Sequence, residues 1–470
     1  MKILLINPPT ENTIESCMPK ILEEDLEYLP PLGLMSIAGY LQKNTTYDIE
    51  ILDCQVDRIS FEKLEEILKN KKINFIGVTT MTFTLIDVIK TAKIAKKINP
   101  NVKIILGGPH VNIYQEETME IPEIDYLILG EGEETIKQVI ENYNNVEQLK
   151  NIKGLVFRDQ SKIINTGQKL LYENLDFLPF PARKLTPYKK YSSILAKKNL
   201  VTTMFTSRGC PYNCLFCDRP HLGKKFRARS AINVVKEFEE CKKLGIEEVF
   251  IYDDTFTIDQ QRVIDICRGI IDKKLNIYWD VRARVNTVDY ELLKLMKKAG
   301  CLRIHYGVEA GTNKILKVLR KGITLEMVEK VFRATKKAGI QTVAYFMIGS
   351  PEETLEDIKS TMRFAKKINP DFIHVSITTP FPATDLYYLG LQKGLIKNDY
   401  WREFAKNPQN DFVPPPWEEN FTKDELIELL KGFYRSFYLR PLYLFKKVVQ
   451  LKSFGELFKK AKGAFRMLRI

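Results

Sequence analysis

Short apolar runs alternate with helix-period segments along the first third of the chain. Each run is apolar along most of its length, as in strands that a sheet buries on both faces. The predicted strands are Lys2–Asn7, Tyr47–Asp53, Ile73–Thr79, Val102–Leu106 and Tyr126–Leu129. Helical patterns separate them at Gly33–Gln42, Phe61–Lys69 and Leu85–Ile98. This alternation predicts a parallel, doubly wound α/β sheet of the Rossmann-like type.

The turns that follow these predicted strands are rich in Pro, Gly, Thr and acidic residues. Ligands of open parallel sheets bind outside the carboxyl ends of the strands, so we expect a cofactor at these turns. The turns are Asn7-Pro8-Pro9, Thr79-Thr80-Met81-Thr82, Gly107-Gly108-Pro109-His110 and Gly130-Glu131-Gly132-Glu133.

A second alternating series begins at residue 201. Six apolar runs are separated by helix-period segments, which predicts an incomplete (β/α)6 version of the eight-unit barrel. The predicted strands are Val201–Thr206, Glu248–Tyr252, Ile277–Val281, Arg303–Val308, Thr342–Ile348 and Phe372–Ile377. The predicted helices include Ala231–Leu244, Tyr290–Lys298, Leu325–Ala338 and Thr354–Lys367.

These patterns divide the 470 residues into four predicted parts. A Rossmann-like domain covers residues 1–145, and a Pro-containing connector with a short hairpin covers 146–197. The barrel covers residues 198–400, and a basic helical extension covers 401–470.

Composition and charge narrow the class of protein. A hydrophobic fraction of 44% is ordinary for a soluble protein, and no charge-free apolar run approaches the ~18 residues of a membrane span. The first nine residues suit a strand entering a turn better than a secretory signal, so we expect a cytoplasmic protein with reduced thiols. The net charge of +13 is uneven, because residues 431–470 hold eleven Lys or Arg and one acid, Glu456.

Three of the eight cysteines lie close together after the first predicted barrel strand. Cys210, Cys214 and Cys217 have the spacing C-x3-C-x2-C. Three thiolates can hold three irons of a four-iron cluster and leave the fourth iron open to a small molecule. The alternative is a closed zinc site in which His221 is the fourth ligand. Zinc sites of this size usually stand alone, whereas these cysteines follow a barrel strand.

The other cysteines have different settings. Those at 241, 267 and 301 lie in apolar or helical segments and are predicted core thiols.

The cysteine motif, with aromatic Phe216 before its last cysteine, resembles that of the radical S-adenosylmethionine (SAM) enzymes over about residues 200–385. The resemblance implies that Cys210, Cys214 and Cys217 bind a [4Fe-4S] cluster whose open iron binds SAM. It also implies further SAM contacts on the carboxyl ends of the barrel strands. These residues are Phe216 near the adenine, Asp253 or Asp254 at the amino group, Arg284 at the carboxylate, Glu309 at the ribose and Gly349 beside the nucleoside.

Two of these assignments are open from the residues alone. The pair Asp253-Asp254 stands where the family often has Gly-Gly-Glu, although a carboxylate can do the same work. For Glu309 or Arg284 taken alone, a buried ion pair at the barrel rim is an equal alternative.

The order of the domains resembles the cobalamin-dependent branch of the same superfamily, in which a B12-binding domain precedes the barrel. The resemblance rests on the turns of the first domain together with Pro31-Leu32-Gly33. It implies cobalamin contacts from residues in those turns, which are Thr80, Gly107, Gly108, His110, Gly130 and Glu131.

The lower cobalt ligand of other B12 domains is missing. They carry Asp-x-His-x-x-Gly, whereas this chain has Asp53-Cys54-Gln55-Val56-Asp57. Members of the radical SAM branch commonly lack this His too, and a weakly ligated cobalt favours release of a methyl radical. A vestigial domain that binds nothing is the alternative. His110 is the lone His of this region. A hydrogen-bonded loop residue is a plainer interpretation of His110 than a cobalt ligand.

The resemblance implies an enzyme that cleaves SAM to a 5′-deoxyadenosyl radical and methylates an unactivated carbon of a small-molecule or lipid-like substrate. It also implies an electron donor such as ferredoxin or flavodoxin. Alternatives are radical C–C bond formation or cyclisation without methyl transfer, and a non-catalytic cobalamin sensor. Methylthiolation of tRNA fits less well, since only Cys17 and Cys54 occur in the first domain.

The basic tail carries an amphipathic pattern. A stripe of apolar residues at three- and four-residue intervals predicts a helix with a basic side. The stripe is Leu451, Phe454, Phe458, Ala461, Phe465 and Leu468. Such a helix can lie on the anionic inner face of a membrane or pack on the barrel. Nucleic acid is a weaker candidate, because nothing in the chain resembles a nucleic-acid module.

Overall fold

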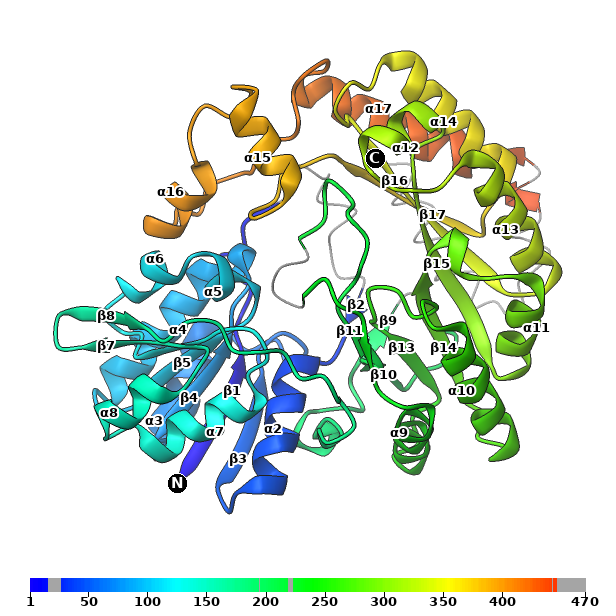
Figure 1. The fold of residues 1–470 in the computed structure, drawn as a ribbon. Helices are drawn as coiled ribbons and strands as arrows, with labels where there is room; N and C mark the ends of the chain where they lie inside the picture. Colours follow the sequence, from blue (N-terminus) through cyan, green and yellow to red (C-terminus); the bar gives the residue numbers. More distant parts are fainter. Residues whose placement is uncertain (16–26, 194, 219–222, 442, 446–470) are drawn as a thin grey trace.

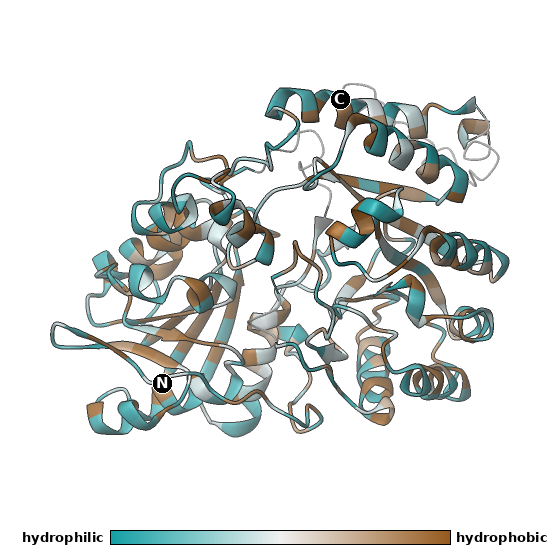
Figure 2. Cartoon of the chain, turned by 45° about the horizontal axis from the view of Figure 1, so that its top comes forward, coloured by the Kyte–Doolittle hydropathy of each residue, from teal (hydrophilic) through white to brown (hydrophobic). Residues whose placement is uncertain are grey.

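A computed structural model of the chain describes residues 1–15, 27–193, 195–218, 223–441 and 443–445. Two sheets dominate it, one formed by the first third of the chain and one by residues 201–377 (Figure 1). Their strands are largely hydrophobic, whereas the helices that cover them alternate between hydrophobic and hydrophilic residues (Figure 2). The predicted stripe of the tail and His221 lie outside the described residues.

The first sheet has the strand order β3-β1-β4-β5-β6-β7-β8. Its parallel part is β1 (Lys2–Asn7), β3 (Asp48–Asp53), β4 (Phe75–Thr79), β5 (Lys103–Gly107) and β6 (Tyr126–Ile128). This is the doubly wound order whose switch point, between β1 and β4, is a common ligand position. The predicted Rossmann-like sheet is confirmed.

Helices cover both faces of this sheet and give two apolar layers, as the alternating sequence predicts. The helices are α2 (Leu32–Asn44), α3 (Phe61–Lys69), α4 (Leu85–Ile98), α5 (Pro109–Ile113), α6 (Gln115–Met119), α7 (Glu133–Asn142) and α8 (Val146–Asn151). A 3-10 turn, η1 (Thr82–Thr84), precedes α4.

The hairpin that we placed in the connector belongs to the first sheet. Strand β7 (Leu155–Asp159) pairs antiparallel with β6, and β8 (Lys162–Asn165) pairs antiparallel with β7. Its buried Leu155, Val156 and Phe157 extend the core of the sheet, a role that the local sequence does not reveal. The domain bounds themselves stay predictions.

The second sheet has sequential, parallel strands, as the (β/α)6 prediction requires. They are β10 (Val201–Met204), β13 (Glu248–Ile251), β14 (Tyr278–Ala283), β15 (Cys301–Glu309), β16 (Gln341–Ile348) and β17 (Phe372–Ile377). The covering helices are α9 (Ala231–Lys243), α10 (Gln260–Asp272), α11 (Tyr290–Lys298), α12 (Asn313–Val318), α13 (Leu325–Lys337) and α14 (Leu355–Ile368).

The barrel stays open, and helix α17 (Lys423–Tyr438) covers its last strand, β17. The hydroxyls of Tyr434 and Tyr438 accept hydrogen bonds from the backbone N–H groups of Val375 and Ile373. They donate back to the carbonyls of the same two residues. The edge strand is therefore satisfied without another strand.

Short elements join the two sheets. Strand β2 (Glu27–Tyr28) pairs with β9 (Ser192–Ser193), and β11 (Ser207–Arg208) pairs with β12 (Arg227–Ala228). The 3-10 turns are η2 (Arg183–Leu185) and η3 (Val285–Thr287). No helix in the described ranges is both long and apolar enough to cross a membrane.

After β17 the chain returns to the first domain as α15 (Asp385–Gln392) and α16 (Tyr400–Lys406) (Figure 1). Trp401 is fully buried in a cluster that includes Leu85 and Tyr114 of the first domain. Its ring centroid lies 5.8 Å from that of Phe83, and its indole N–H donates to the Pro380 carbonyl at 2.9 Å. The segment around Trp401 therefore holds the two domains together.

Replacing Trp401 by Ala should lower the free energy of unfolding by about 3–5 kcal/mol, because it empties a buried aromatic site between the domains. Urea denaturation followed by circular dichroism measures this. Tyr388→Ala on α15 is the control, since its side chain is 53% exposed and its effect should stay within about 0.5 kcal/mol. Equal effects of the two substitutions would contradict the proposed packing role.

Candidate functional site

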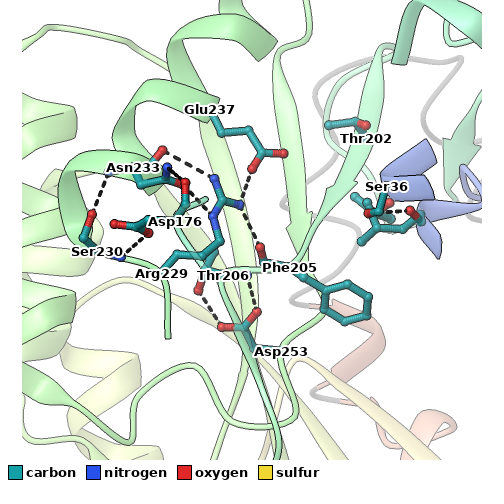
Figure 3. A network of polar contacts seen from close by, with 12 residues as sticks. Ser36, Asp176, Thr202, Phe205, Thr206, Arg229, Ser230, Asn233, Glu237 and Asp253 are labelled. Carbon is teal, nitrogen blue, oxygen red and sulfur yellow. Dashed lines mark hydrogen bonds and ion pairs between the residues drawn. The ribbon is translucent and has the colours of Figure 1, made fainter. Parts of the chain in front are cut away.

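The cysteine loop, which we define as residues 209–226, follows β11, and the chain reaches it through the short segment in which β10 passes into β11. Asp253, at the end of β13, fixes this point from below (Figure 3). Its Oδ1 accepts from the backbone N–H of Thr206 at 2.6 Å, and its Oδ2 accepts from the hydroxyls of Thr206 at 2.5 Å and Ser207 at 2.6 Å. Asp253 is fully buried, so its carboxylate is engaged in holding the strand end.

A second carboxylate, Glu237 of α9, holds the same strand end from the side (Figure 3). It accepts from Arg229, and it accepts from Arg183 at 2.5 Å. Arg229 also donates to the Phe205 carbonyl at 2.9 Å, and Arg183 donates to the Thr203 carbonyl at 2.8 Å. Burial acts to raise the pKa of Glu237, but the two guanidinium groups outweigh it and lower that pKa.

The three motif cysteines differ in exposure and none is in a disulfide: Cys214 is buried, Cys210 is partly buried and Cys217 is exposed. Burial raises the pKa of the Cys210 thiol, and the negative charge of Asp254 acts in the same direction. Asp254, which is exposed, therefore lies within electrostatic range of the Cys210 thiol.

The thiols do not converge into a formed metal site. Among the described residues, no three His, Cys, Asp or Glu side chains come close enough together to hold a metal ion. The donor set nevertheless fits an iron–sulfur cluster, because one loop at a strand end supplies three thiols of suitable spacing. A buried cation also lies against one of them.

That cation is Arg284, which follows β14. It donates to the Sγ of Cys214 at 3.4 Å and to the Lys321 carbonyl, and its guanidinium carbon lies 3.7 Å from the centre of the Tyr212 ring. Its Nε has no hydrogen-bond partner among the described residues. A guanidinium in this position stabilises thiolate charge and offers a further donor toward the loop.

Glu309 forms a buried ion pair, the alternative that we weighed from the sequence. Its Oε1 lies 2.6 Å from Nζ of Lys321, and both side chains are 8% exposed. Glu309 has φ +70°. A Cβ at Gly307 would collide with Oε1 of Glu309 and lie 2.6 Å from Nζ of Lys321, so a side chain at Gly307 would displace this ion pair. Lys321 Nζ also lies 5.7 Å from the centre of the Phe216 ring.

Lys321 and Tyr212 were missed by the sequence analysis. Lys321 follows an unremarkable short helix, and Tyr212 is one of several aromatic residues near the cysteines. No local pattern singles them out, because their importance comes from contacts with Glu309 and Arg284.

Other contacts hold the far side of the cysteine loop. The backbone N–H of Leu215 donates to the Leu319 carbonyl at 3.0 Å, and the Leu215 carbonyl accepts from the N–H of Leu386 at 2.9 Å. Leu215 and Leu386 are buried together with Trp417, and the half-buried Phe216 packs against them. The loop is thus fixed by the barrel and by α15.

Gly349 ends β16 in the left-handed conformation, with φ +75°. A Cβ there would lie 2.7 Å from Cδ2 of Leu426 on α17, so close packing of that helix already requires glycine. In the same turn, burial raises the pKa of Glu353 to about 7, and its Oε2 accepts from the N–H of Ser350 at 2.9 Å.

The turns of the first domain pack tightly on one another. The N–H of Thr80 donates to the Gly107 carbonyl at 2.7 Å, and the N–H of His110 donates to the Thr80 carbonyl at 3.2 Å. Gly108 has φ +118°, and a Cβ there would lie 2.7 Å from the Thr80 oxygen. Gly108 therefore lets the ends of β4 and β5 approach closely, at the ligand edge of the sheet.

His110 is fully buried, and burial lowers its pKa to about 3, so the imidazole is neutral at physiological pH. Its Nδ1 lies 3.1 Å from the Thr82 hydroxyl, and its Nε2 has no hydrogen-bond partner in the part of the chain that the structure describes. Gln55, at the position of the missing cobalt ligand, donates to Asn7 Oδ1 at 3.2 Å and is thus held by the β1 turn.

Gly130 and Glu131 follow β6. The N–H of Gly130 donates to Oδ1 of Asn112 at 2.7 Å. Glu131 is buried and binds two arginines of the second domain, Arg208 and Arg227. Its partners lie 77 and 96 residues away, so no sequence pattern could have identified them.

Comparison with known proteins agrees with the two halves of this structure. The B12 binding domain model matches residues 20–140, and the Radical SAM superfamily model matches residues 204–365. An uncharacterized methyltransferase of Pyrococcus horikoshii is 35% identical over 97% of this chain and 96% of its own length.

Two further matches are more distant. The anaerobic magnesium-protoporphyrin IX monomethyl ester cyclase of Cereibacter sphaeroides is 29% identical over 87% of this chain and 67% of its own length. The solved structure of TsrM from Kitasatospora setae, a radical SAM methyltransferase with cobalamin and a [4Fe-4S] cluster bound, is 17% identical. It aligns with a TM-score of 0.69 over 83% of this chain and 78% of the other.

The order of the two family models agrees with the relative that matches nearly the full length and with the fold. The chain therefore belongs to the radical SAM superfamily, in the branch that carries a B12-binding domain ahead of the radical SAM domain.

Proposed function

We propose that this protein is a cobalamin-dependent radical SAM methyltransferase that methylates an unactivated carbon of a small-molecule substrate. The observation that carries the proposal is the cysteine loop itself. It stands at the carboxyl end of the first barrel strand, with the buried Arg284 against Cys214, and its base contacts the turn after β6 of the B12-binding domain. The base of the cysteine loop and the turn after β6 of the B12-binding domain are therefore in direct contact.

When bound, the cluster and SAM supply a 5′-deoxyadenosyl radical that takes hydrogen from the substrate, and cobalamin supplies the methyl group. We propose that Cys210, Cys214 and Cys217 bind the cluster and that Asp254 receives the SAM amino group. We propose that Arg284 binds the carboxylate group of SAM next to the cluster, through its Nε, which has no hydrogen-bond partner among the described residues. An external donor such as ferredoxin or flavodoxin would supply the electron.

For the remaining SAM contacts, the ion pair between Glu309 and Lys321 supports a joint role. The Lys321 ammonium neutralises the Glu309 carboxylate and holds it in one position, which suits recognition of ribose hydroxyls. The same ammonium approaches Phe216, which we propose lies near the adenine. Gly349 would line the nucleoside only through its backbone, because Leu426 occupies the space on the other side.

On the cobalamin side, we propose contacts from the backbone-rich turns at Thr80, Gly107, Gly108 and Gly130. Gln55 is hydrogen-bonded to Asn7 and to the Pro8 carbonyl, so this turn offers no imidazole to cobalt. His110 keeps a neutral ring with one unpartnered nitrogen, which suits a hydrogen bond to the cofactor better than ligation from a fully buried position.

Ring formation without methyl transfer is the second candidate function, favoured by the similarity to the magnesium-protoporphyrin ester cyclase. The higher identity and fuller coverage of the methyltransferase from Pyrococcus horikoshii favour methyl transfer. Metabolite profiling of cells with and without the protein separates the two functions, since one adds the mass of a methylene group and the other changes ring count and hydrogen content.

Serine at Cys210, Cys214 or Cys217 should abolish iron–sulfur absorption and the release of 5′-deoxyadenosine after anaerobic reconstitution, because an alkoxide or hydroxyl is a poor iron ligand here. Cys241→Ala is the control, since that thiol is buried in the barrel core and raised in pKa by burial to about 11. Retention of the cluster in all three serine variants, or zinc in place of iron, would refute the proposed function.

Asp254→Asn should raise the KM for SAM without loss of folding or iron, because it removes a charge that faces the loop from an exposed position. Asp253→Asn should instead lower the melting temperature, because it weakens the bonds that hold Thr206 and Ser207. Steady-state assays over a range of SAM concentrations and thermal melts distinguish the two. The opposite pattern would assign the SAM contact to Asp253.

The basic tail gives a proposal about location. If residues 441–470 form the predicted amphipathic helix on a membrane, the full chain should sediment with vesicles that contain anionic lipid, and less so at high salt. A chain truncated after residue 440 should remain in the supernatant. If truncation leaves the sedimentation unchanged, the tail does not make the proposed membrane contact, and the argument for a lipid-like substrate fails with it.

A further inference from the structure

Four charged side chains connect the base of the cysteine loop with the B12-binding domain, and we call them the interdomain ion network. They are Arg208, Arg227, Glu131 and Glu133. The two arginines come from the two strands that enclose the loop, β11 and β12, where they are direct register partners. The two glutamates lie on either side of Gly132, Glu131 in the turn after β6 and Glu133 at the first position of α7.

The contacts within the network are short and shielded from water. Arg208 reaches Glu131 at 2.9 Å and Glu133 at 2.5 Å, through different nitrogens of its guanidinium group. Arg227 donates to both oxygens of Glu131, at 2.8 and 2.9 Å. The side chains of Glu131 and Arg227 are each 2% exposed.

The charges enforce one geometry. Burial would raise the pKa of Glu133, but Arg208 outweighs it and lowers that pKa, so the pair stays ionised. A buried ion that loses its partner is strongly destabilised, so each arginine is held to its glutamate. The connector takes part as well, since the N–H of Tyr172 donates to Glu131 at 2.7 Å and its carbonyl accepts from Arg227 at 2.7 Å.

The ladder that carries the arginines cannot hold the loop alone. Strands β11 and β12 pair over two residues each, and an isolated ladder of that length is not stable in water. Arg208 is two residues from Cys210, so a shift of Arg208 is transmitted directly to the first motif cysteine. The position of the loop base is therefore set partly by the B12-binding domain.

We propose that the interdomain ion network sets the distance and orientation between the cluster and cobalamin, and that Glu131 and Glu133 are positioning residues and not cobalamin ligands. This inference rests on the proposed function. Hydrogen abstraction and methyl delivery must reach the same substrate carbon from two cofactors on different domains. A displacement of about 1 Å between reacting groups is enough to slow such a reaction severely.

The test uses the full chain with both cofactors reconstituted anaerobically. Glu131→Gln keeps the shape of the side chain, removes its charge and replaces one of its two acceptor oxygens by a donor. Arg227→Lys keeps the charge but not the forked geometry. Glu173→Gln is the matched control, because it breaks an exposed bridge of 2.8 Å to Lys225 of the same cysteine loop. Iron, cobalamin and the thermal transition are measured first.

The informative readout is the magnetic interaction between reduced cluster and cob(II)alamin, followed by electron paramagnetic resonance without substrate. We expect both Glu131→Gln and Arg227→Lys to retain the two cofactors and to show a weaker or more broadly distributed interaction, whereas Glu173→Gln matches the parent. SAM that donates its methyl group becomes S-adenosylhomocysteine, whereas SAM that supplies the radical ends as 5′-deoxyadenosine. The ratio of S-adenosylhomocysteine to 5′-deoxyadenosine should fall by roughly 10-fold or more in the two network variants.

Other outcomes overturn it. An unchanged magnetic interaction with an unchanged product ratio would show that the network does not position the cofactors. Loss of cobalamin with retention of the cluster would make Glu131 a cofactor contact, and loss of both together with the folding transition would leave the network a purely structural role. A parent protein that binds no cobalamin would refute the proposed function itself.

Discussion

The arrangement of this protein depends on buried carboxylates that hold the backbone on either side of the cysteine loop. Asp253 and Glu237 fix the strand end before the loop, and Glu131 fixes the two-residue ladder that closes it. A loop that must present three thiols cannot be stabilised by apolar packing alone, because thiolates and a charged cofactor require polar surroundings. Paired charges supply both polarity and rigidity, but removing one member of a buried pair destabilises the fold because the other charge stays buried without a partner.

Buried carboxylates with hydrogen-bond partners also stabilise the contact between the domains. The apolar cluster around Trp401 excludes water from one side of that contact. On another side, the buried carboxylate of Asp53 accepts from the hydroxyl of Tyr191 at 2.8 Å and from Asn7 at 2.7 Å. The two domains thus meet through large apolar rings and through buried, hydrogen-bonded acids. Such a contact favours one relative placement, as a reaction shared by two cofactors requires.

The charges nearest the cysteines are mostly cationic or neutralised. Arg284 lies against Cys214, and Lys321 is neutralised by Glu309 beside Phe216. Asp254 supplies an exposed acid whose charge acts on Cys210. This distribution suits a ligand that carries both an ammonium and a carboxylate group, and it also limits the negative charge that accumulates around reduced iron and thiolates.

The sequence by itself determined the secondary structure, the order of the two sheets and the cofactor class. Helices α3, α4 and α11 were predicted with correct ends, and strands β1 and β17 likewise, because amphipathic period and buried apolar runs are local properties. The cysteine spacing is local as well. What depends on partners far away in the chain was decided only by the tertiary structure. Asp253 holds Thr206, and Glu131 binds arginines of the other domain. The sequence around a carboxylate in a turn is the same whether that carboxylate binds a ligand or a guanidinium group that is distant in the chain. The hairpin β7–β8 joined the first sheet for a related reason, because an edge strand is specified by the strand beside it and not by its own residues.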